Sequence, residues 1–496
     1  MKKEKIKSWF KDKYNLAFVA ILIFAFAIRL YYFFLTKNQP LWWDEAEYML
    51  KAKNIAFHTP DTGWASLRPP LAPWILSLFF FIGLGEKTIH FSIIILSLAN
   101  LILIYLLGKE LFDKKIAILG VFIYSIIYLD LFYTTRILLN VPELFFGLLI
   151  FYLFYMFYVN GKKYFFLFVI VSIFGILLRY TVGIYLIIIL IFIVFMRDIS
   201  PIISEKKFRM FLYFIIALII IVIISAFFIK INLINSFIEA FKGATLTRSE
   251  SISSVFFSFI LTVPKTIHFF TIFFILGFLI YFYNYFLIID KIITKKRDPF
   301  AMKKTFSLLW VLIPFLIYGL LINHYEDRYI LMAFPIVCLL VANGLFFVFD
   351  FLKKYNKFIA VLIFFILLIF GSYQIINHSN LIIKAKLTSY DSVKEAGLWL
   401  KENTNKSDII ISRSVPQITY YSERATYNFP ENENLLDKFI QEKKPKFIID
   451  SIWEKTDPWI RQYISQHNET LTPVMAYYSN LQGQKELTLV VYEVKE

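Results

Sequence analysis

The chain has 496 residues, of which 59% are hydrophobic, and its formal net charge is +16. A soluble domain is typically about 45–50% apolar, so the composition excludes an ordinary soluble protein. The positive charge does not indicate nucleic-acid binding, because the lysines cluster in short loops between apolar runs, as the positive-inside rule describes. The single cysteine, Cys338, excludes an internal disulfide and a zinc site built from cysteines.

Apolar runs long enough to cross about 30 Å of hydrocarbon recur from residue 15 to about residue 377. They predict a polytopic α-helical membrane protein with about 11 transmembrane helices. The first run lacks a small-residue cleavage site, so we expect a retained helix and not a signal peptide. The predicted helices cover residues 15–35, 88–108, 116–133, 142–159, 164–179, 182–196, 210–230, 266–289, 305–322, 329–350 and 357–377.

The first predicted helix is followed by a long polar loop, residues 36–87. The loop opens with "QPLWWDEAEYML" (39–50), in which three carboxylates follow two tryptophans. Tryptophan suits the membrane interface, and residues three or four apart share one face if this stretch is helical. The loop ends with "PPLAPWILSLFFFIGLG" (69–85), which is too short and broken to span the bilayer and is predicted to lie along its surface.

The stretch 164–196 is apolar throughout, but "RYTVG" (179–183) interrupts it. A single helix of that length would run about 50 Å at 1.5 Å per residue, much more than the hydrocarbon requires. The break therefore favours two short helices. A single span would also place two basic loops on the outer side, against the charge rule.

The distribution of lysine and arginine predicts the orientation of the chain. The basic N-terminus, residues 1–14, is predicted to be cytoplasmic, because the alternate loops that share its side are much richer in lysine and arginine than the others. These inner segments are residues 109–115, 160–163, 197–209, 290–304 and 351–357. We expect a multi-pass protein of the cell membrane, with a transmembrane domain over residues 15–377.

The last part of the chain, residues 380–496, is much more polar. "YDSVKEAGLWLKENT" reads as an amphipathic helix, "SDIIISRS", "KPKFIID" and "KELTLVVYEVKE" as short strands, and the regions near 431–443 and 457–467 as helices. This alternation predicts a small α/β domain. An odd number of membrane spans places it on the extracytoplasmic side.

Three polar clusters are predicted on that same outer side: "WWDEAEY" with "SLRPPLAP", "YTTRILLNVPELFF", and "NHYEDRYILMAFP". Charges at a membrane boundary are costly and tend to face a cavity and carry function. Arg68, Arg136 and Arg328 each lie beside a helix end, and guanidinium groups are well suited to a phosphate. A solvated loop with an aromatic belt, snorkelling arginines or ion pairs with nearby carboxylates would explain each cluster taken alone.

His324, Glu326 and Asp327 supply imidazole and carboxylate groups that could bind a divalent metal, Mg²⁺ or Mn²⁺. Their spacing is not specific, and a helix-capping role explains them equally well. Metal dependence therefore stays open at this level.

Taken in order, the acidic pair after the first helix, the basic residue before "PPL", the "R…P" of the second outer loop and the late "RY(I/L)L…P" resemble the GT-C glycosyltransferases. The most similar group is the dolichyl-phosphate-mannose protein mannosyltransferase and aminoarabinose transferase-like superfamily. The resemblance spans about residues 15–350. It implies inverting transfer of a sugar from a polyprenyl phosphate, dolichyl or undecaprenyl, to an acceptor hydroxyl of a protein, glycan or lipid.

The resemblance also implies roles for individual residues. Asp44 matches the catalytic carboxylate, and Glu45 is its acidic neighbour. Arginines and a tyrosine match the positions that hold the donor phosphate: Arg68, Arg136, Arg328 and Tyr329. Supporting roles fall to Glu47, Asn140 and Glu143; many relatives carry aspartate where this chain has Asn140, so Glu143 is expected to supply that carboxylate.

Three other functions remain open. A lipid flippase or transporter would use the same charged cavity without chemistry, although inverted repeats and helices broken at mid-membrane are not evident. An oligosaccharyltransferase of the same broad fold would need a "WWDYG"-type stretch in the soluble domain, where this chain has "SIWEKTDPW". A scaffold whose outer domain binds partners would leave the loop carboxylates unexplained.

Overall fold

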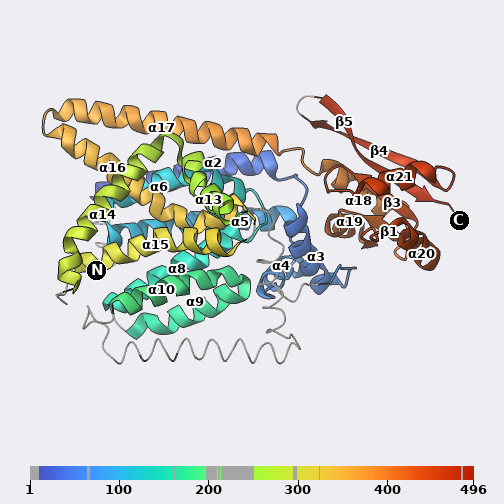
Figure 1. The fold of residues 1–496 in the computed structure, drawn as a ribbon, viewed down its shortest axis with the longest axis horizontal. Coiled ribbons are helices and arrows are strands. Elements are labelled where there is room, and N and C mark those ends of the chain that lie inside the picture. Colours follow the sequence, from blue (N-terminus) through green and yellow to red (C-terminus); the bar gives the residue numbers. More distant parts are fainter. Residues whose placement is uncertain are drawn as a thin grey trace.

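The computed structural model describes residues 11–63, 68–160, 162–196, 209, 213, 251–293, 299–322, 324–481 and 484–495. Within these residues, long helices form an elongated bundle, and a small domain with the C-terminus lies beyond one end of it (Figure 1). The turn between the last two bundle helices, residues 354–356, lies at the opposite end, as does the start of the described chain.

The helices of the bundle follow the hydropathy of the sequence. They are α2 (Lys13–Thr36), α5 (Glu86–Leu111), α6 (Lys114–Ile126), α7 (Tyr128–Thr134), α8 (Asn140–Asn160), α9 (Phe165–Leu178), α10 (Gly183–Met196), α13 (Ile252–Ile267), α14 (Thr271–Ile293), α15 (Pro299–Leu321), α16 (Phe334–Lys353) and α17 (Lys357–Ala385). Seven helical spans of the described part are long and apolar enough to cross a membrane, or eight if the bent pair α6–α7 counts as one. The predicted class, a polytopic helical membrane protein with a small C-terminal α/β region, is confirmed.

The predicted number of about 11 transmembrane helices is not confirmed. The predicted helix 210–230 lies outside the described residues, apart from residue 213. The helices α9 and α10 have 14 residues each, or about 21 Å at 1.5 Å per residue, and are short for a span. The break predicted between them is present, because Arg179 is extended and a short 3-10 helix, η2 (Tyr180–Val182), precedes α10.

Two features of the bundle differ from the expected helices. The predicted span 116–133 is bent by 56° between α6 and α7, at Ile127. The helix α13 occupies residues that we expected in an outer loop, 231–265. Its buried residues Val255, Phe259, Thr262 and Val263 recur at helical spacing, and it packs on α15. Its exposed side chains include Phe257, Ile260 and Leu261, so the helix is apolar on both faces, and together with α14 as far as Ile288 it forms one of the candidate membrane spans.

A buried ion pair lies beside the α6–α7 bend. Arg29 of α2 pairs with Asp130 of α7, and both side chains are fully buried. Asp130 also accepts hydrogen bonds from Ser97 (2.8 Å) and Tyr124 (3.2 Å). Arg29 donates to the carbonyl of Ser125 (3.2 Å), which lies in the last turn of α6. The ion pair and the two hydrogen bonds to Asp130 compensate the buried charges. The bond from Arg29 also gives the Ser125 carbonyl, which the bend leaves without a helical partner, a hydrogen-bond donor.

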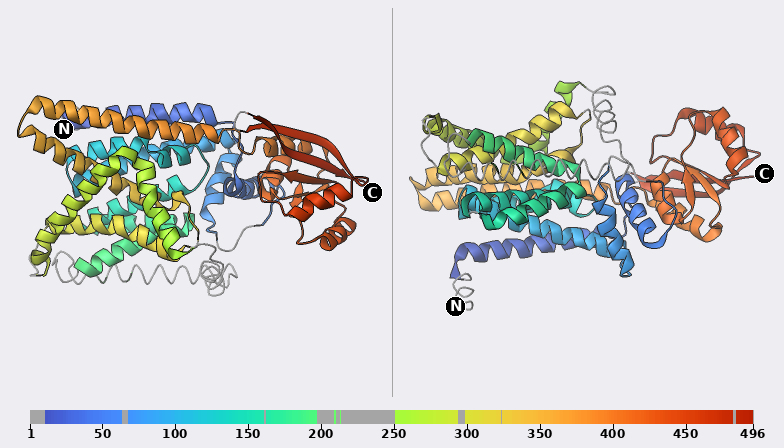
Figure 2. Two further views of the ribbon diagram at one scale, coloured as in Figure 1. Left: turned by 45° about the horizontal axis from the view of Figure 1, so that its top comes forward. Right: turned by 90° about the horizontal axis from the view of Figure 1, so that it is seen from below.

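The first long loop is largely helical. It contains α3 (Trp43–Phe57) and α4 (Leu71–Phe81), which pack on each other between the bundle and the C-terminal domain (Figure 2). The backbone N–H of Trp42 donates to the Glu45 carboxylate at 2.7 Å, so a side chain from the first turn caps α3. The stretch 69–85, which we expected to be too short to span the bilayer, contains the 11-residue helix α4; its position along the membrane surface stays a prediction.

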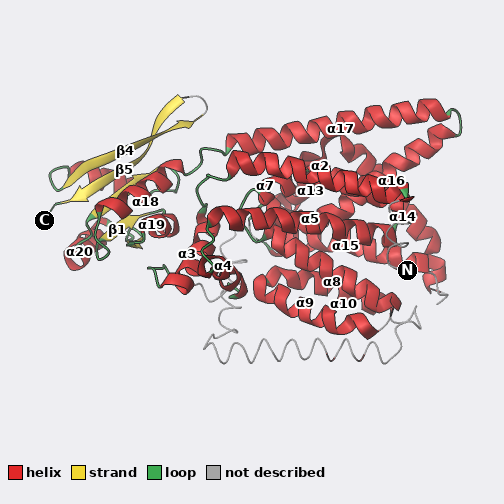
Figure 3. Ribbon diagram, turned by 180° about the vertical axis from the view of Figure 1, so that it is seen from behind, coloured by secondary structure: helices red, strands yellow, loops and turns green. Residues whose placement is uncertain are grey.

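The C-terminal domain holds every strand of the described residues (Figure 3). Its elements are α18 (Asp391–Asn403), β1 (Ile409–Ser412), α19 (Val415–Ser422), β2 (Ala425–Tyr427), α20 (Glu433–Lys443), β3 (Phe447–Ser451), α21 (Pro458–Gln466), β4 (Leu471–Leu481) and β5 (Gln484–Val494). The sheet order is β2-β1-β3-β5-β4, with β2, β1 and β3 parallel and β5 and β4 antiparallel.

Alternate residues of the central strands face opposite sides of this sheet. Ile410 and Ile449 pack in one apolar cluster with residues of α18, whereas Ile411 and Ile448 pack in another with residues of α20 and α21. Helices therefore cover both faces, and a short strand buried on both faces is apolar throughout, as in "DIIIS". The strands β2 and β4 and the helix α19 were not predicted from the sequence.

Candidate active site

The acidic stretch of the first loop forms the first two turns of α3. Asp44 and Glu47 are three residues apart and lie on one face, with Tyr48 beside them, whereas Glu45 points to the other side. The side chain of Asp44 is 31% exposed and that of Glu45 is 1% exposed. Adjacent carboxylates thus have opposite environments.

Asp44 lies between two arginines from distant parts of the chain. Its Oδ1 accepts a hydrogen bond from Arg68 Nη2 at 3.2 Å, and its Oδ2 accepts one from Arg328 Nη1 at 3.0 Å. Arg68 also pairs with Glu47, and Arg328 pairs with Glu326. We call these five residues the Asp44 network. Their side chains are 17–33% exposed, so each remains accessible to a small molecule.

A cavity of about 310 Å³ opens beside this network. It is lined by Trp42, Trp43, Asp44, Tyr133, Leu138, Glu326, Arg328 and Tyr390. The lining comes from the first loop, the α7–α8 region, the segment before α16 and the start of the C-terminal domain. The cavity therefore combines carboxylates, a guanidinium and aromatic rings, which suits a polar ligand that also has apolar faces.

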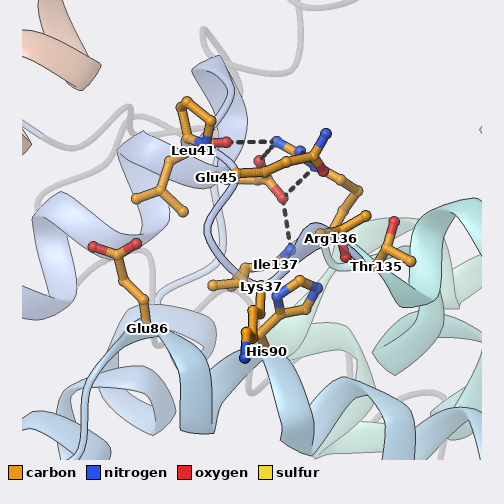
Figure 4. A pocket seen from close by; sticks show the side chains of 11 residues that line it. Lys37, Leu41, Glu45, Glu86, His90, Thr135, Arg136 and Ile137 are labelled. Atoms are coloured by element: carbon orange, nitrogen blue, oxygen red, sulfur yellow. Dashed lines mark hydrogen bonds and ion pairs between the residues drawn. The ribbon is translucent and has the colours of Figure 1, made fainter. Parts of the chain in front are cut away.

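Glu45 and Arg136 form a second, buried ion pair, which we call the Glu45 clamp (Figure 4). Glu45 Oε1 accepts from Arg136 Nε at 3.0 Å and from the backbone N–H of Ile137 at 2.6 Å. Arg136 also donates to the side-chain oxygen of Gln39 and the carbonyl of Pro40, both at 3.1 Å, and its guanidinium lies 4.1 Å from the Trp42 ring. Arg136 is 3% exposed.

The Glu45 clamp joins the first loop to the loop between α7 and α8. The cavity beside it, drawn in Figure 4, measures about 20 Å³ and has room for about one water molecule. It is too small for a sugar. The roles predicted for Glu45 in catalysis and for Arg136 in phosphate binding stay predictions, and neither side chain lines the larger cavity.

Glu143 and Asn140, predicted as supporting residues, lie in the first turn of α8. Glu143 pairs with Arg179 at 2.8 Å and accepts a hydrogen bond from Thr181. Asn140 is 3% exposed, and its side-chain oxygen has no hydrogen-bond partner among the described residues. Arg179 was missed as a site residue. An arginine placed in a break between two apolar runs is the signal that could have identified it.

Burial and nearby arginines act on the pKa values of α3. Burial raises the pKa of the Tyr48 hydroxyl above its ordinary value, although the positive charges of Arg179 and Arg68 oppose that rise. Burial also raises the pKa of Glu47, again against the effect of Arg68. The positive charges of Arg68, Arg179 and Arg328 all lower the pKa of Tyr48. This face of α3 therefore lies near three guanidinium groups.

The residues suggested for a metal lie at the edge of the Asp44 network, in the segment before the 3-10 helix η4 (Asp327–Ala333). His324 Nε2 lies 3.3 Å from Glu326 Oε1 and 3.1 Å from the Tyr329 hydroxyl. Asp327 instead accepts hydrogen bonds from the hydroxyls of Tyr128 (2.9 Å) and Tyr133 (2.7 Å). The described residues contain no group of three His, Cys, Asp or Glu side chains arranged around one metal position.

His324, Glu326 and Asp327 therefore do not form a site suited to Mg²⁺ or Mn²⁺, because Asp327 binds the two tyrosines and Glu326 pairs with Arg328. Dependence on a divalent metal stays a prediction. We derive no chemical step from it.

Comparison with known proteins agrees with this architecture. Residues 67–228 match the family model of dolichyl-phosphate-mannose-protein mannosyltransferase. Comparison with curated proteins gives no match.

Solved structures of similar fold include those of two enzymes. The oligosaccharyltransferase AglB from Archaeoglobus fulgidus, in complex with an inhibitory peptide and a dolichol-phosphate, has a TM-score of 0.62 at 14% identity, covering 97% of this chain and 74% of that one. Its complex with Zn and sulfate has a TM-score of 0.59 at 15% identity, covering 94% and 73%. ArnT from Cupriavidus metallidurans, bound to undecaprenyl phosphate, has a TM-score of 0.59 at 11% identity, covering 96% and 97%.

At these identities the structural likeness shows the fold alone. AglB and ArnT are both GT-C glycosyltransferases, and the match to the mannosyltransferase family model falls within the same superfamily. The family match and the fold together support an integral-membrane enzyme that transfers glycosyl groups. The predicted resemblance is thus confirmed: residues 67–228 match the mannosyltransferase family model, and the chain shares its fold with the glycosyltransferases AglB and ArnT.

Proposed function

We propose that this protein transfers a sugar from a polyprenyl phosphate, dolichyl or undecaprenyl, to an acceptor hydroxyl, with inversion at the anomeric carbon. The donor sugar is a hexose or pentose, and the reaction takes place on the extracytoplasmic face. The observation that carries the proposal is the position of Asp44, which lies between Arg68 and Arg328 at the wall of the 310 Å³ cavity.

That arrangement supplies the two groups the reaction needs. The acceptor hydroxyl must lose a proton as it attacks, and a positioned carboxylate can accept that proton. The leaving phosphate must have its charge met, and guanidinium groups aimed at it can do so. Asp44 is assigned as the base, and Arg68 and Arg328 as the phosphate ligands, with Tyr329 beside Arg328.

The step is a single displacement. The acceptor oxygen forms a bond to the anomeric carbon while the bond from that carbon to the phosphate oxygen breaks, and the proton passes to Asp44. One carboxylate suffices, because a retaining route would need a covalent intermediate on a second group. Before the donor binds, the two arginines are paired with Asp44. A bound phosphate competes for them and leaves carboxylate oxygens free to accept the hydroxyl.

The Glu45 clamp and the Glu143–Arg179 pair are assigned to holding the loops that carry these groups. Glu45 and Arg136 are buried with their polar groups occupied, which favours a positioning role over direct contact with the donor. Glu47 orients Arg68 through their ion pair. Asn140, whose side-chain oxygen lacks a partner among the described residues, keeps the supporting role that the family resemblance implies.

A transfer assay tests the proposal. Full-length protein and its Asp44→Asn variant, in lipid nanodiscs, receive a panel of radiolabelled polyprenyl-phosphate hexoses and pentoses with protein, glycan and lipid acceptors. The assay is run with EDTA and with added Mg²⁺ or Mn²⁺. Transfer by the wild type and its loss in an equally stable variant support the proposal. Saturable donor binding without transfer to any acceptor would instead favour a carrier of lipid-linked sugars.

A further inference from the structure

We propose that the C-terminal domain forms one wall of the acceptor site: Tyr390, with Trp42 and Trp43, holds a sugar ring of a carbohydrate acceptor against Asp44. This inference rests on the proposed function and names the class of acceptor that the same cavity takes. Its evidence is the composition of the cavity lining and the way the domain is fixed to the first loop.

The cavity beside Asp44 is closed on one side by Tyr390, which immediately precedes α18. The Tyr390 ring lies 6.4 Å from the Trp42 ring, and Trp43 lines the same cavity. The Trp42 indole N–H is buried and has no acceptor among the described residues. Aromatic rings thus line the same cavity as the polar groups of Asp44, Glu326 and Arg328.

Tyr390 is held firmly in this position. Its backbone is left-handed, with φ +67°, an unfavourable conformation for a residue with a bulky side chain. Its ring stacks on Trp453 at 5.2 Å, and its hydroxyl donates to the Glu454 carboxylate at 3.0 Å. Trp453 in turn donates its indole N–H to Ser392 at 2.8 Å. A strained residue that its surroundings hold so completely is consistent with a functional position.

The domain that carries Tyr390 is fastened to the first loop by α19. The Tyr421 hydroxyl accepts a hydrogen bond from the backbone N–H of Leu41 at 2.9 Å, and the Tyr420 hydroxyl donates to Glu86 at 3.0 Å. Lys53 of α3 pairs with Glu423 at 2.6 Å. The tyrosines are 4% and 5% exposed and share an apolar cluster with α3. Tyr390 and Asp44 are therefore held on one rigid support.

The chemistry of this lining points to a sugar ring. A pyranose presents C–H groups on its faces, which pack on aromatic rings, and hydroxyls on its edge, which bond to carboxylates and guanidinium groups. Tyrosine and tryptophan join an apolar face to a polar edge.

Substitution of Tyr390 tests the inference. In the transfer assay, Tyr390→Ala is expected to raise the KM for a saccharide acceptor roughly tenfold, because an aromatic contact is lost, while the KM for the donor stays within about twofold. Tyr390→Phe keeps the ring and should retain most of the affinity. The acceptors compared are methyl glycosides of hexoses and N-acetylhexosamines and peptides that contain serine and threonine. Transfer to peptides alone would overturn the inference.

Two matched variants exclude a structural explanation. Tyr478→Ala removes an exposed tyrosine of β4 far from the cavity lining, and its KM values should not change. Lys53→Ala loosens the domain without removing a cavity residue, so it should lower the thermal midpoint with little effect on the KM for the acceptor. If Lys53→Ala raises the KM for the acceptor as much as Tyr390→Ala does, the effect of Tyr390→Ala comes only from weaker docking of the C-terminal domain, and the inference fails.

A binding measurement separates this inference from the proposed function. Methyl glycosides titrated into the full-length protein should change the tryptophan fluorescence saturably, and Tyr390→Ala should abolish that change. If the wild type transfers no sugar but this saturable change is present, the proposed reaction fails and the carbohydrate site stands. If the wild type transfers sugar but Tyr390→Ala leaves the KM for the acceptor and the titration unchanged, the proposed reaction stands and the inference is wrong.

Discussion

Asp44 and Glu45 are adjacent in the sequence and each pairs with arginine, yet they lie in different surroundings. The Asp44 network lies at a cavity, and its side chains are 17–33% exposed. The Glu45 clamp is buried, with 1% and 2% of its two side chains exposed. A carboxylate–arginine pair is therefore accessible to a ligand in one place and holds two loops together in the other.

The difference follows from desolvation. A buried pair with every polar group satisfied is lost only at a large cost, because the remaining charge has no water to solvate it. A partly exposed pair is worth little to stability and can be exchanged for another anion. Exposure at a cavity, and not the presence of an ion pair, thus distinguishes a candidate catalytic carboxylate from a structural one. Four predictions test this distinction.

The largest effect on stability is expected for Glu45→Ala. It leaves the Arg136 guanidinium buried and unpaired, which should lower the free energy of unfolding by about 3–5 kcal/mol. Asp44→Ala should change it by no more than about 1 kcal/mol. Thermal melts of the purified proteins in one detergent compare the two. Equal losses of stability would contradict the distinction, and Glu45→Met with Arg136→Met together should recover most of the loss.

The opposite order is expected for activity. Asp44→Asn should lower kcat by about 10²- to 10⁴-fold, because a positioned general base contributes that much. Its thermal midpoint should match that of the wild type. Initial rates with saturating donor and acceptor measure the effect. A stable Asp44→Asn protein with full activity would move the base to another residue.

Arginine-to-lysine substitutions should distinguish the Asp44 network from the Glu45 clamp, with smaller effects on activity and stability than the carboxylate substitutions. Arg328→Lys keeps the charge but loses the planar fork that meets two oxygens, so the KM for the donor should rise about 10- to 100-fold, as expected for a lost charged hydrogen bond. Arg136→Lys should chiefly lower the thermal midpoint, because its guanidinium donates to Glu45, Gln39 and Pro40. If Arg136→Lys raised the KM for the donor and Arg328→Lys did not, the predicted role of Arg136 in binding the phosphate would be supported.

The smallest effect concerns the docking of the C-terminal domain and depends on pH. Burial tends to raise the pKa of Glu423, but hydrogen bonds from Lys401 and Lys53 outweigh it and hold that pKa below its ordinary value. The folded state therefore binds its proton less readily than the unfolded state, so the stabilisation is present at neutral pH and is lost as the pH falls through the folded pKa.

Glu423→Gln should thus lower the thermal midpoint by about 1 °C at pH 7, as expected for a partly buried pair worth about 1 kcal/mol in a chain of this length. The difference from the wild type should vanish on acidification below the ordinary carboxyl pKa. Melts over a pH series measure it. A difference that grows as the pH falls would show that the pair acts with the opposite sign.

Local patterns in the sequence predicted most of the fold. Long apolar runs predicted α2, α5, α8, α9 and α10 to within a few residues, whereas α15 begins at Pro299 and not at 305, and α17 runs on to Ala385 and not to 377. In the C-terminal domain, the runs "DIIIS" and "KFIID" predicted β1 and β3. Missed elements include α13, which carries Pro264 near its end, and β4, where Pro473 lies at an irregular register.

The site was predictable only in part. Residue types and the family resemblance pointed to Asp44, Arg68 and Arg328, which the structure brings together. Arg136 was grouped with them because it also lies beside a helix end. Its pairing with Glu45 depends on two loops separated by 91 residues in the chain, so sequence position does not reveal it. Tyr390 gave no local signal, since its place at the cavity depends on how the C-terminal domain docks.

The sequence by itself determined the class of protein, because membrane crossing depends on the length and polarity of each segment and these are local properties. It also determined which charged residues had to avoid lipid. Only the tertiary structure decided which carboxylate meets which arginine, and which of those pairs remains exposed at a cavity. Burial and pairing depend on neighbours that arrive from distant segments, and they decide whether a charge is solvated, compensated or free to act.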